Sequence, residues 1–209
     1  MARRTKEEAE QTRRRILASA LSLFVKNGYD RTTFTQIAAR LKLTKGAVYW
    51  HFASKEALLI ALVDEMLEKF HRQIDELMPK GGLTFPAVAE MMVANAQRLV
   101  NDPKSTAFFM LMKTQIRWGE DSMAHVREEL MSGRTAGPYH AFLEAIGNDI
   151  AAGRVRGEIN GEAVATVCMS MWEGMVQAKI GKFLRCDLTE TLKRAFDAVW
   201  KSIRAGEEA

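Results

Sequence analysis

Residues 33–52, TFTQIAARLKLTKGAVYWHF, constrain the fold most, because they encode two short helices joined by a tight turn. Thr33 and Gln36 have the spacing of a capping box, in which each side chain bonds the backbone amide of the other residue, so a helix is expected to begin there. Thr44 is a second candidate N-cap and predicts a second helix over residues 45–51. Helices this short are not stable alone, so the pair needs a third helix to pack on.

The preceding segment supplies that third helix. Apolar residues recur between residues 8 and 27 with the period of about 3.6 residues that gives a helix one apolar face. Gly28 follows and can adopt the left-handed conformation that ends a helix. The apolar residues of this face are Ile16, Leu17, Ala20, Leu21 and Phe24.

The second helix of the pair carries the residues whose side chains most directly indicate a function. Val48 and Phe52 lie four positions apart and are expected to point inward, with Trp50 near the edge. A flat, basic outer face fits a DNA major groove about 12 Å wide, where the first residues of a recognition helix meet base edges. The alternative, that the aromatic residues only form core, stays open. The residues expected on the outer face are Lys45, Gly46, Ala47, Tyr49 and His51.

Basic charge is concentrated in the segment that holds the helix pair. The chain has a formal net charge of +4, yet residues 1–60 hold 12 Lys and Arg against five Asp and Glu. This asymmetry is typical of a protein that binds a polyanion, either a nucleic acid or an anionic membrane surface, and the helix pair favours nucleic acid. In the arm over residues 1–7, Arg3, Arg4 or Lys6 either contact phosphates or the minor groove, or belong to a frayed tail.

The helix pair and its flanks resemble the DNA-binding domain of the TetR family of bacterial transcriptional regulators. The similarity extends without a gap over residues 14–59, and the opening residues are similar to those of the AcrR-type subgroup, repressors of multidrug-efflux operons. The resemblance implies a homodimeric repressor that leaves its operator when a small hydrophobic or drug-like effector binds. The positions that carry it are Gly28, Thr33, Ile37, Ala38, Gly46, Tyr49, Phe52, Lys55 and Leu58.

The DNA contacts implied by this resemblance fall in two groups. Lys45 is expected to meet bases, while Gly46 and Ala47 allow close approach. Thr35 on the preceding helix is a further candidate. Phosphate contacts are implied at Thr33, Thr44, Tyr49, His51 and Lys55.

An activator or a ligand-independent regulator would carry the same DNA-binding domain, so these alternatives to a repressor stay open.

The whole sequence predicts an all-α fold. We expect an N-terminal three-helix helix-turn-helix DNA-binding domain at residues 1–54 and a larger helical effector-binding and dimerisation domain at residues 55–209. Helical periodicity, with breaks at Gly and Pro, predicts about nine helices in total. Among them are a helix over residues 105–118 and a helix over residues 121–152 that is kinked at Gly137 and Pro138.

The larger domain is rich in methionine and aromatic residues. Methionine adapts to several shapes and aromatic faces accept flat or cationic molecules, which suits an effector cavity. The same residue types also fill a solid core, so this alternative stays open. The residues expected to line the cavity are Met91, Asn95, Phe108, Met112, Trp118, Met169, Trp172 and Glu173.

The last two helices have wide apolar faces that suit pairing with a second copy of the chain. A two-fold dimer places two recognition helices about 34–36 Å apart, which matches a near-palindromic operator in double-stranded DNA. Completion of the monomer core is the alternative. The residues expected at the dimer interface are Met171, Met175, Phe196, Val199 and Trp200.

The sequence lacks the motifs that would indicate another class of function. The His residues have no HExxH spacing, and no GxGxxG, P-loop or GxSxG motif occurs. Cys168 and Cys186 lack the spacing of metal ligands, so we expect free thiols in a reducing cytoplasm and no metal or cofactor. No apolar run approaches the roughly 20 residues that cross a bilayer, and no membrane partner is expected. The remaining alternative is a helical adaptor whose basic face binds a membrane or a protein.

Overall fold

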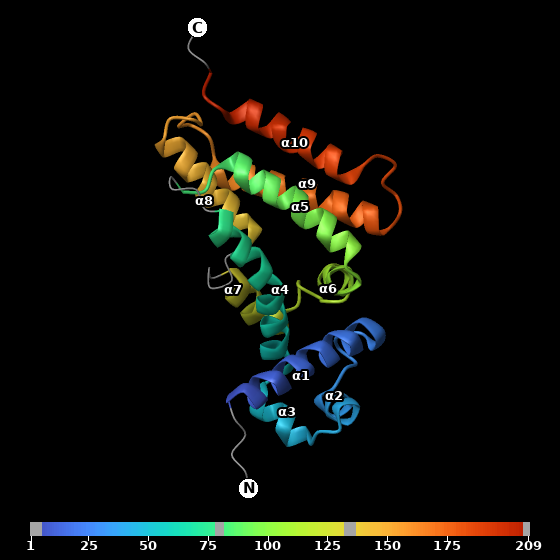
Figure 1. Cartoon of the computed structure of the whole chain (residues 1–209). Coiled ribbons are helices and arrows are strands. Elements are labelled where there is room, and N and C mark those ends of the chain that lie inside the picture. The colour runs from blue at the N-terminus through green and yellow to red at the C-terminus, as the bar shows by residue number, and fades with distance from the viewer. Residues whose placement is uncertain (1–5, 78–81, 132–136, 207–209) are drawn as a thin grey trace. The chain divides into compact units, whose positions relative to one another are not determined.

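The computed structural model describes residues 6–77, 82–131 and 137–206. Within these ranges the predicted all-α fold is confirmed, with ten α-helices, one 3-10 helix and an isolated β-bridge between Val155 and Arg204 (Figure 1). No helix in the described ranges is both long and apolar enough to span a membrane. Arg3 and Arg4 lie outside the described residues, whereas Lys6 begins the first helix.

The first of two compact units comprises Met1–Met66 and Ala107–Met131. Its core joins residues of the first three helices to Leu111, Ile116 and Val126 from the second stretch. The unit is therefore larger than the domain predicted at residues 1–54, because these later residues complete the core beneath the helix pair. Its elements are α1 (Lys6–Asn27), α2 (Phe34–Leu41), α3 (Lys45–His51), the first part of α4 (Lys55–Leu77), most of α6 (Pro103–Thr114), the 3-10 helix η1 (Asp121–Met123) and α7 (Ala124–Met131).

The second unit comprises Leu67–Thr106 and Ser132–Ala209. Besides the remainders of α4 and α6, it contains α5 (Phe85–Asn101), α8 (Pro138–Ala151), α9 (Gly161–Ile180) and α10 (Leu188–Ile203). Helix α10 packs along α5 and α9, and α8 packs on both α5 and α9 (Figure 1). Aromatic rings fill this core: Phe85 stacks on Trp200 with ring centroids 5.6 Å apart, and Phe142 contacts both Phe85 and Phe196.

A buried carboxylate joins α8 to the start of α5 in the second unit. Asp149 is fully buried, and its Oδ2 accepts a hydrogen bond of 2.8 Å from the backbone N–H of Phe85. Its Oδ1 accepts a second bond of 2.7 Å from Nε of Arg154. Because a buried charge is costly unless it is paired and hydrogen-bonded, these two donors are what make Asp149 tolerable at this position.

Two predicted helices end differently in the structure. Helix α6 stops at Thr114 rather than reaching Trp118, because the indole N–H of Trp118 turns back and donates to the carbonyl of Met112 at 2.7 Å. That bond satisfies one of the carbonyls that a helix end leaves open. The helix predicted over residues 121–152 is divided into η1, α7 and α8, and Pro138 begins α8, where its missing N–H costs nothing. Within the described ranges, this division raises the number of helices above the predicted nine.

Candidate nucleic-acid interface

The α2–α3 pair has the local geometry that its sequence predicts. The Thr33 hydroxyl accepts a 3.3 Å bond from the Gln36 N–H, and the Gln36 side chain accepts a 2.8 Å bond from the Thr33 N–H, so the capping box is confirmed. Lys42 ends α2 in the left-handed conformation, with φ of 55°. Thr44 then caps α3 by accepting a 3.1 Å bond from the Ala47 N–H. Only three residues, 42–44, separate the two helices.

The inner faces of the pair are fixed by the core of the first unit. Val48 is fully buried and Phe52 is 4% exposed, and both belong to the cluster that includes Ile16 and Phe24 of α1. The guanidinium of Arg13 lies 5.2 Å from the centroid of the Phe52 ring. Because α3 has only seven residues, these contacts rather than its own hydrogen bonds set its orientation.

The outer face of α3 is flat at its start and aromatic at its end. Lys45 and Gly46 are exposed and Ala47 is half-buried. A Cβ placed on Gly46 would meet only the Thr44 hydroxyl, at 3.9 Å, so packing within the chain does not require a glycine there. Tyr49 is 49% exposed and rests edge-on against Phe34, with ring centroids 4.8 Å apart. The small residues leave room for another molecule to approach the backbone of the first turn.

The threonines implied as DNA contacts are also exposed, at Thr33, Thr35 and Thr44. Thr33 and Thr44 use their hydroxyl oxygens as acceptors in the two caps. A hydroxyl that accepts a hydrogen bond still has its own hydrogen to donate, so a cap residue can also serve a phosphate oxygen. The caps therefore fix these hydroxyls in place at the start of each helix.

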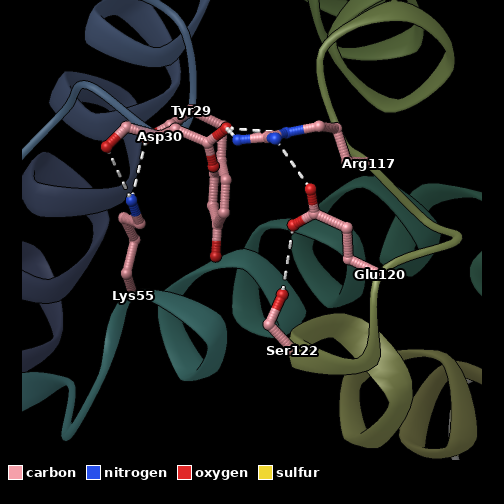
Figure 2. Close-up of polar contacts among 6 residues, drawn as sticks. All are labelled: Tyr29, Asp30, Lys55, Arg117, Glu120 and Ser122. Atoms are coloured by element: carbon pink, nitrogen blue, oxygen red, sulfur yellow. Dashed lines mark hydrogen bonds and ion pairs between the residues drawn. The ribbon is translucent and has the colours of Figure 1, made fainter.

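His51 and Lys55 are less open than the resemblance implies. The His51 ring is half-buried, with its centroid 4.6 Å from that of Trp50. The Lys55 ammonium donates to the carbonyl oxygens of Tyr29 at 3.0 Å and Asp30 at 3.2 Å, and it lies 4.4 Å from the centroid of the Tyr29 ring (Figure 2). In this structure Lys55 ties the start of α4 to the turn after α1, and its phosphate contact stays a prediction.

Trp50 is a residue of α3 that the sequence pattern did not single out as a DNA contact. It was expected near the helix edge, yet 72% of it is exposed. A large, exposed aromatic ring next to Tyr49 can contact sugars, phosphates or the methyl group of thymine. The helical wheel contained the signal, since Trp50 lies two residues from the fully buried Val48 and therefore about 200° around the helix from it.

The residues predicted to line an effector cavity are divided between the two units, and their shared cavity stays a prediction. Phe108, Met112 and Trp118 belong to the first unit, whereas the other five belong to the second. Met91 and Trp172 are buried, and the Trp172 indole donates to the Met92 carbonyl at 2.8 Å. The remaining three, Asn95, Met169 and Glu173, are half-buried.

A different cavity, of about 240 Å³, lies between α5 and α10 in the second unit. None of the eight predicted cavity residues lines it, but two of the predicted dimer residues do. Its lining consists of Phe85, Pro86, Ala89, Glu90, Val93, Lys193, Phe196, Asp197 and Trp200.

The predicted dimer residues differ in how much of their surface is available. Phe196 is only 2% exposed and contacts Phe142, so it belongs to the core of a single chain. Met171, Met175, Val199 and Trp200 are half-buried. Val167 on α9, which is not among the predicted dimer residues, is 49% exposed.

Comparison with known proteins connects this geometry to a family. Residues 16–62 match the model of the bacterial regulatory proteins of the tetR family. The HTH-type transcriptional regulator TtgR of Pseudomonas putida is 28% identical over 183 residues, which cover 85% of this chain and 84% of TtgR. The HTH-type transcriptional regulator AcrR of Shigella flexneri is 41% identical over 86 residues, which cover 41% of this chain and 38% of AcrR.

A solved structure supports the same fold. SmeT, the repressor of the Stenotrophomonas maltophilia multidrug efflux pump SmeDEF, aligns with a TM-score of 0.72 over 94% of this chain and 92% of SmeT. The two sequences are 21% identical, so this likeness concerns the fold alone.

The short capped pair on a third helix, with its exposed face at the start of α3, defines a helix-turn-helix DNA-binding protein. The family model covers this pair, the C-terminal part of α1 and the first part of α4. Residues 16–62 match the TetR family, and the likeness to the HTH-type transcriptional regulator TtgR extends over most of the chain, in agreement with the sequence-based prediction of a TetR-type DNA-binding transcriptional regulator.

Proposed function

We propose that the chain is a homodimeric repressor that binds a near-palindromic operator and leaves it when a small hydrophobic or drug-like molecule binds. In this proposal residues 1–54 form the DNA-binding domain, with Lys55 directly after it, residues 55–209 bind the effector and form the dimer, and the protein acts in the cytoplasm. Effector binding must favour a conformation that DNA binds less well, because a ligand shifts an equilibrium only by its differential affinity for the two states.

The observation that carries the DNA-reading part is the open first turn of α3. Lys45 is exposed there, and Gly46 and Ala47 have no bulky side chains, so that the backbone can approach base edges. Thr33, Thr44 and Tyr49 surround this turn at positions that suit phosphate contacts, with Thr35, His51 and Lys55 as further candidates. We add Trp50 to this set because of its exposure.

The dimer proposal rests on the apolar residues that α9 and α10 leave at the surface. Met171, Met175, Val199 and Trp200 each keep part of their side chains accessible, and Val167 extends this surface along α9. A two-fold interface needs one self-complementary patch, which two adjacent helices can supply. Phe196 is not part of this proposal, because it is already buried within one chain.

The effector class is proposed from the relatives. SmeT is the repressor of a multidrug efflux pump and has also been solved as a complex with triclosan, with a TM-score of 0.75 to this chain at 22% identity. The methionines and aromatic residues of the larger domain, among them Met91, Met169 and Trp172, provide an adaptable apolar environment for such a molecule. We therefore propose a small, largely apolar effector and regulation of an efflux operon.

The test is a fluorescence-anisotropy titration of the purified chain with a labelled duplex from the region upstream of its own gene. We expect tight binding, a species of twice the 23.5 kDa chain mass in light scattering, and release of the DNA by triclosan as the probe effector. Equal affinity for upstream and unrelated DNA would refute the operator proposal. Specific binding that triclosan and related apolar compounds leave unchanged would refute only the effector proposal.

A further inference from the structure

The turn between α1 and α2, residues 28–32, is contacted by two other segments of the first unit. Lys55 at the start of α4 donates to the carbonyl oxygens of Tyr29 and Asp30. The Asp30 carboxylate accepts two hydrogen bonds from Arg117, from Nε at 3.1 Å and from Nη2 at 2.5 Å (Figure 2). Asp30 therefore contacts α4 through its backbone and the segment after α6 through its side chain.

Arg117 is oriented by its own neighbours before it meets Asp30. Its Nη1 lies 2.7 Å from Oε1 of Glu120, and Oε2 of Glu120 accepts a 3.4 Å bond from the Ser122 hydroxyl (Figure 2). Arg127 adds a further restraint, because its guanidinium donates to the carbonyl oxygens of Trp118 and Glu120. The loop between α6 and η1 thus presents the Arg117 guanidinium in a defined position.

The turn that contains Asp30 has a well-defined conformation. Gly28 adopts φ of +91°, which strongly favours glycine. Thr32 is 1% exposed, and its hydroxyl donates to the carbonyl oxygens of Gly28 at 2.8 Å and Leu23 at 3.3 Å. Thr33, the N-cap of α2, follows directly. A displacement of Asp30 would therefore be passed to the start of α2 rather than absorbed by a loose loop.

Stability does not account for the Asp30–Arg117 pair. The Arg117 side chain is 65% exposed and that of Asp30 is 52% exposed, and ion pairs of this kind contribute little to the free energy of unfolding. Their residues are 87 positions apart, so the pair does not support a local element such as a helix. Its effect is to hold two segments of the first unit in one arrangement.

We propose that Arg117 is a positioning residue for DNA binding. Through Asp30 it holds the α2–α3 pair in a fixed orientation relative to the α6–α7 segment of the same unit. The inference rests on the proposed function, in which α3 reads the operator. It gives the loop after α6 a direct route to the DNA-reading helices that does not pass through α4.

The test exploits the opposite charges of the two residues. We would measure the affinity of wild type, Arg117→Gln and Asp30→Asn for a labelled duplex from the upstream region of the gene. If charge alone mattered, loss of Arg117 would weaken binding, whereas loss of the negative Asp30 would strengthen it. Positioning predicts that both variants bind about two- to fivefold more weakly, the range expected for an exposed ion pair.

Further variants separate positioning from other effects. The charge swap Asp30→Arg with Arg117→Asp should recover most of the affinity, because it restores the pair without changing the net charge. Arg117→Lys should recover only part of it, since lysine lacks the guanidinium fork. The matched control is Arg194→Gln, which breaks an ion pair of 2.6 Å with Glu190 on α10, where the side chains are also exposed. It should leave DNA binding unchanged, and all variants should keep the wild-type melting temperature.

Tighter binding by Asp30→Asn, or a charge swap that is no better than either single variant, would overturn this inference alone. Wild-type protein that does not distinguish upstream from unrelated DNA would overturn the proposed function and this inference with it.

Discussion

Gly46→Ala should make the protein more stable and its DNA binding weaker. Gly46 is the second residue of α3, and an added Cβ would meet only the Thr44 hydroxyl, at the ordinary contact distance of 3.9 Å. Glycine costs about 1 kcal/mol relative to alanine inside a helix, and we take about half of that for a residue in the first turn. The expected gain of about 0.5 kcal/mol in the free energy of unfolding corresponds to a rise of roughly 1–2 °C in melting temperature for a chain of this size.

The same methyl group would stand between the α3 backbone and the base edges. Inserting a methyl into a closely packed contact costs about 1–3 kcal/mol, which corresponds to a roughly 5- to 150-fold loss of affinity. The assay is fluorescence anisotropy with the upstream duplex, paired with a thermal melt of each variant. Gly147→Ala is the matched control, because Gly147 lies in α8 with nothing within 4 Å of an added Cβ. It should raise the free energy of unfolding by about 1 kcal/mol, because Gly147 lies inside its helix, and leave DNA binding unchanged. Unaltered DNA affinity of Gly46→Ala would refute the proposal that the first turn of α3 enters the groove.

Three further predictions concern single residues. Trp50→Ala should change the free energy of unfolding by less than about 0.5 kcal/mol, because the residue is 72% exposed, and should weaken DNA binding by more than about 1 kcal/mol. A variant that binds DNA as tightly as the wild type does would exclude a DNA contact by Trp50. Asp149→Ala should lower the free energy of unfolding in urea by about 2–4 kcal/mol, and Asp149→Asn by less, because an amide oxygen can still accept the Phe85 N–H bond; equal losses would contradict that role. Burial raises the pKa of the Cys168 thiol to about 12, so at pH 8 an aromatic disulfide reagent should label only the exposed Cys186 rapidly. Cys186→Ser should therefore remove the fast phase of labelling. Fast labelling that persists in this variant would show that Cys168 is accessible.

Local patterns in the sequence predicted the DNA-reading pair well. The capping box of Thr33 and Gln36, the Thr44 cap and the stop at Gly28 all depend on residues within a few positions of one another, and all are confirmed. The exposure of Trp50 could have been predicted in the same way, from its angle to Val48.

Contacts between distant residues were beyond the reach of these patterns. The end of α6 depends on a bond from the Trp118 side chain to the Met112 carbonyl, which helical periodicity does not encode. The ion pair between Asp30 and Arg117 joins residues 87 positions apart. Periodicity also does not distinguish an aromatic residue that lines a cavity from one that fills a core, and Trp172, which is 6% exposed, illustrates this.

Above all, we propose that the basic N-terminal helix pair of a dimer binds a specific DNA sequence. The most direct measurement is the affinity of the purified chain for its own upstream duplex and for an unrelated duplex of equal length, over a series of salt concentrations. Contact with about ten phosphates per dimer predicts a slope near −9 in log K against log salt, and specific affinity should exceed nonspecific affinity by at least about a thousandfold. Equal affinity for the two duplexes, or binding that does not respond to salt, would contradict sequence-specific binding by this helix pair.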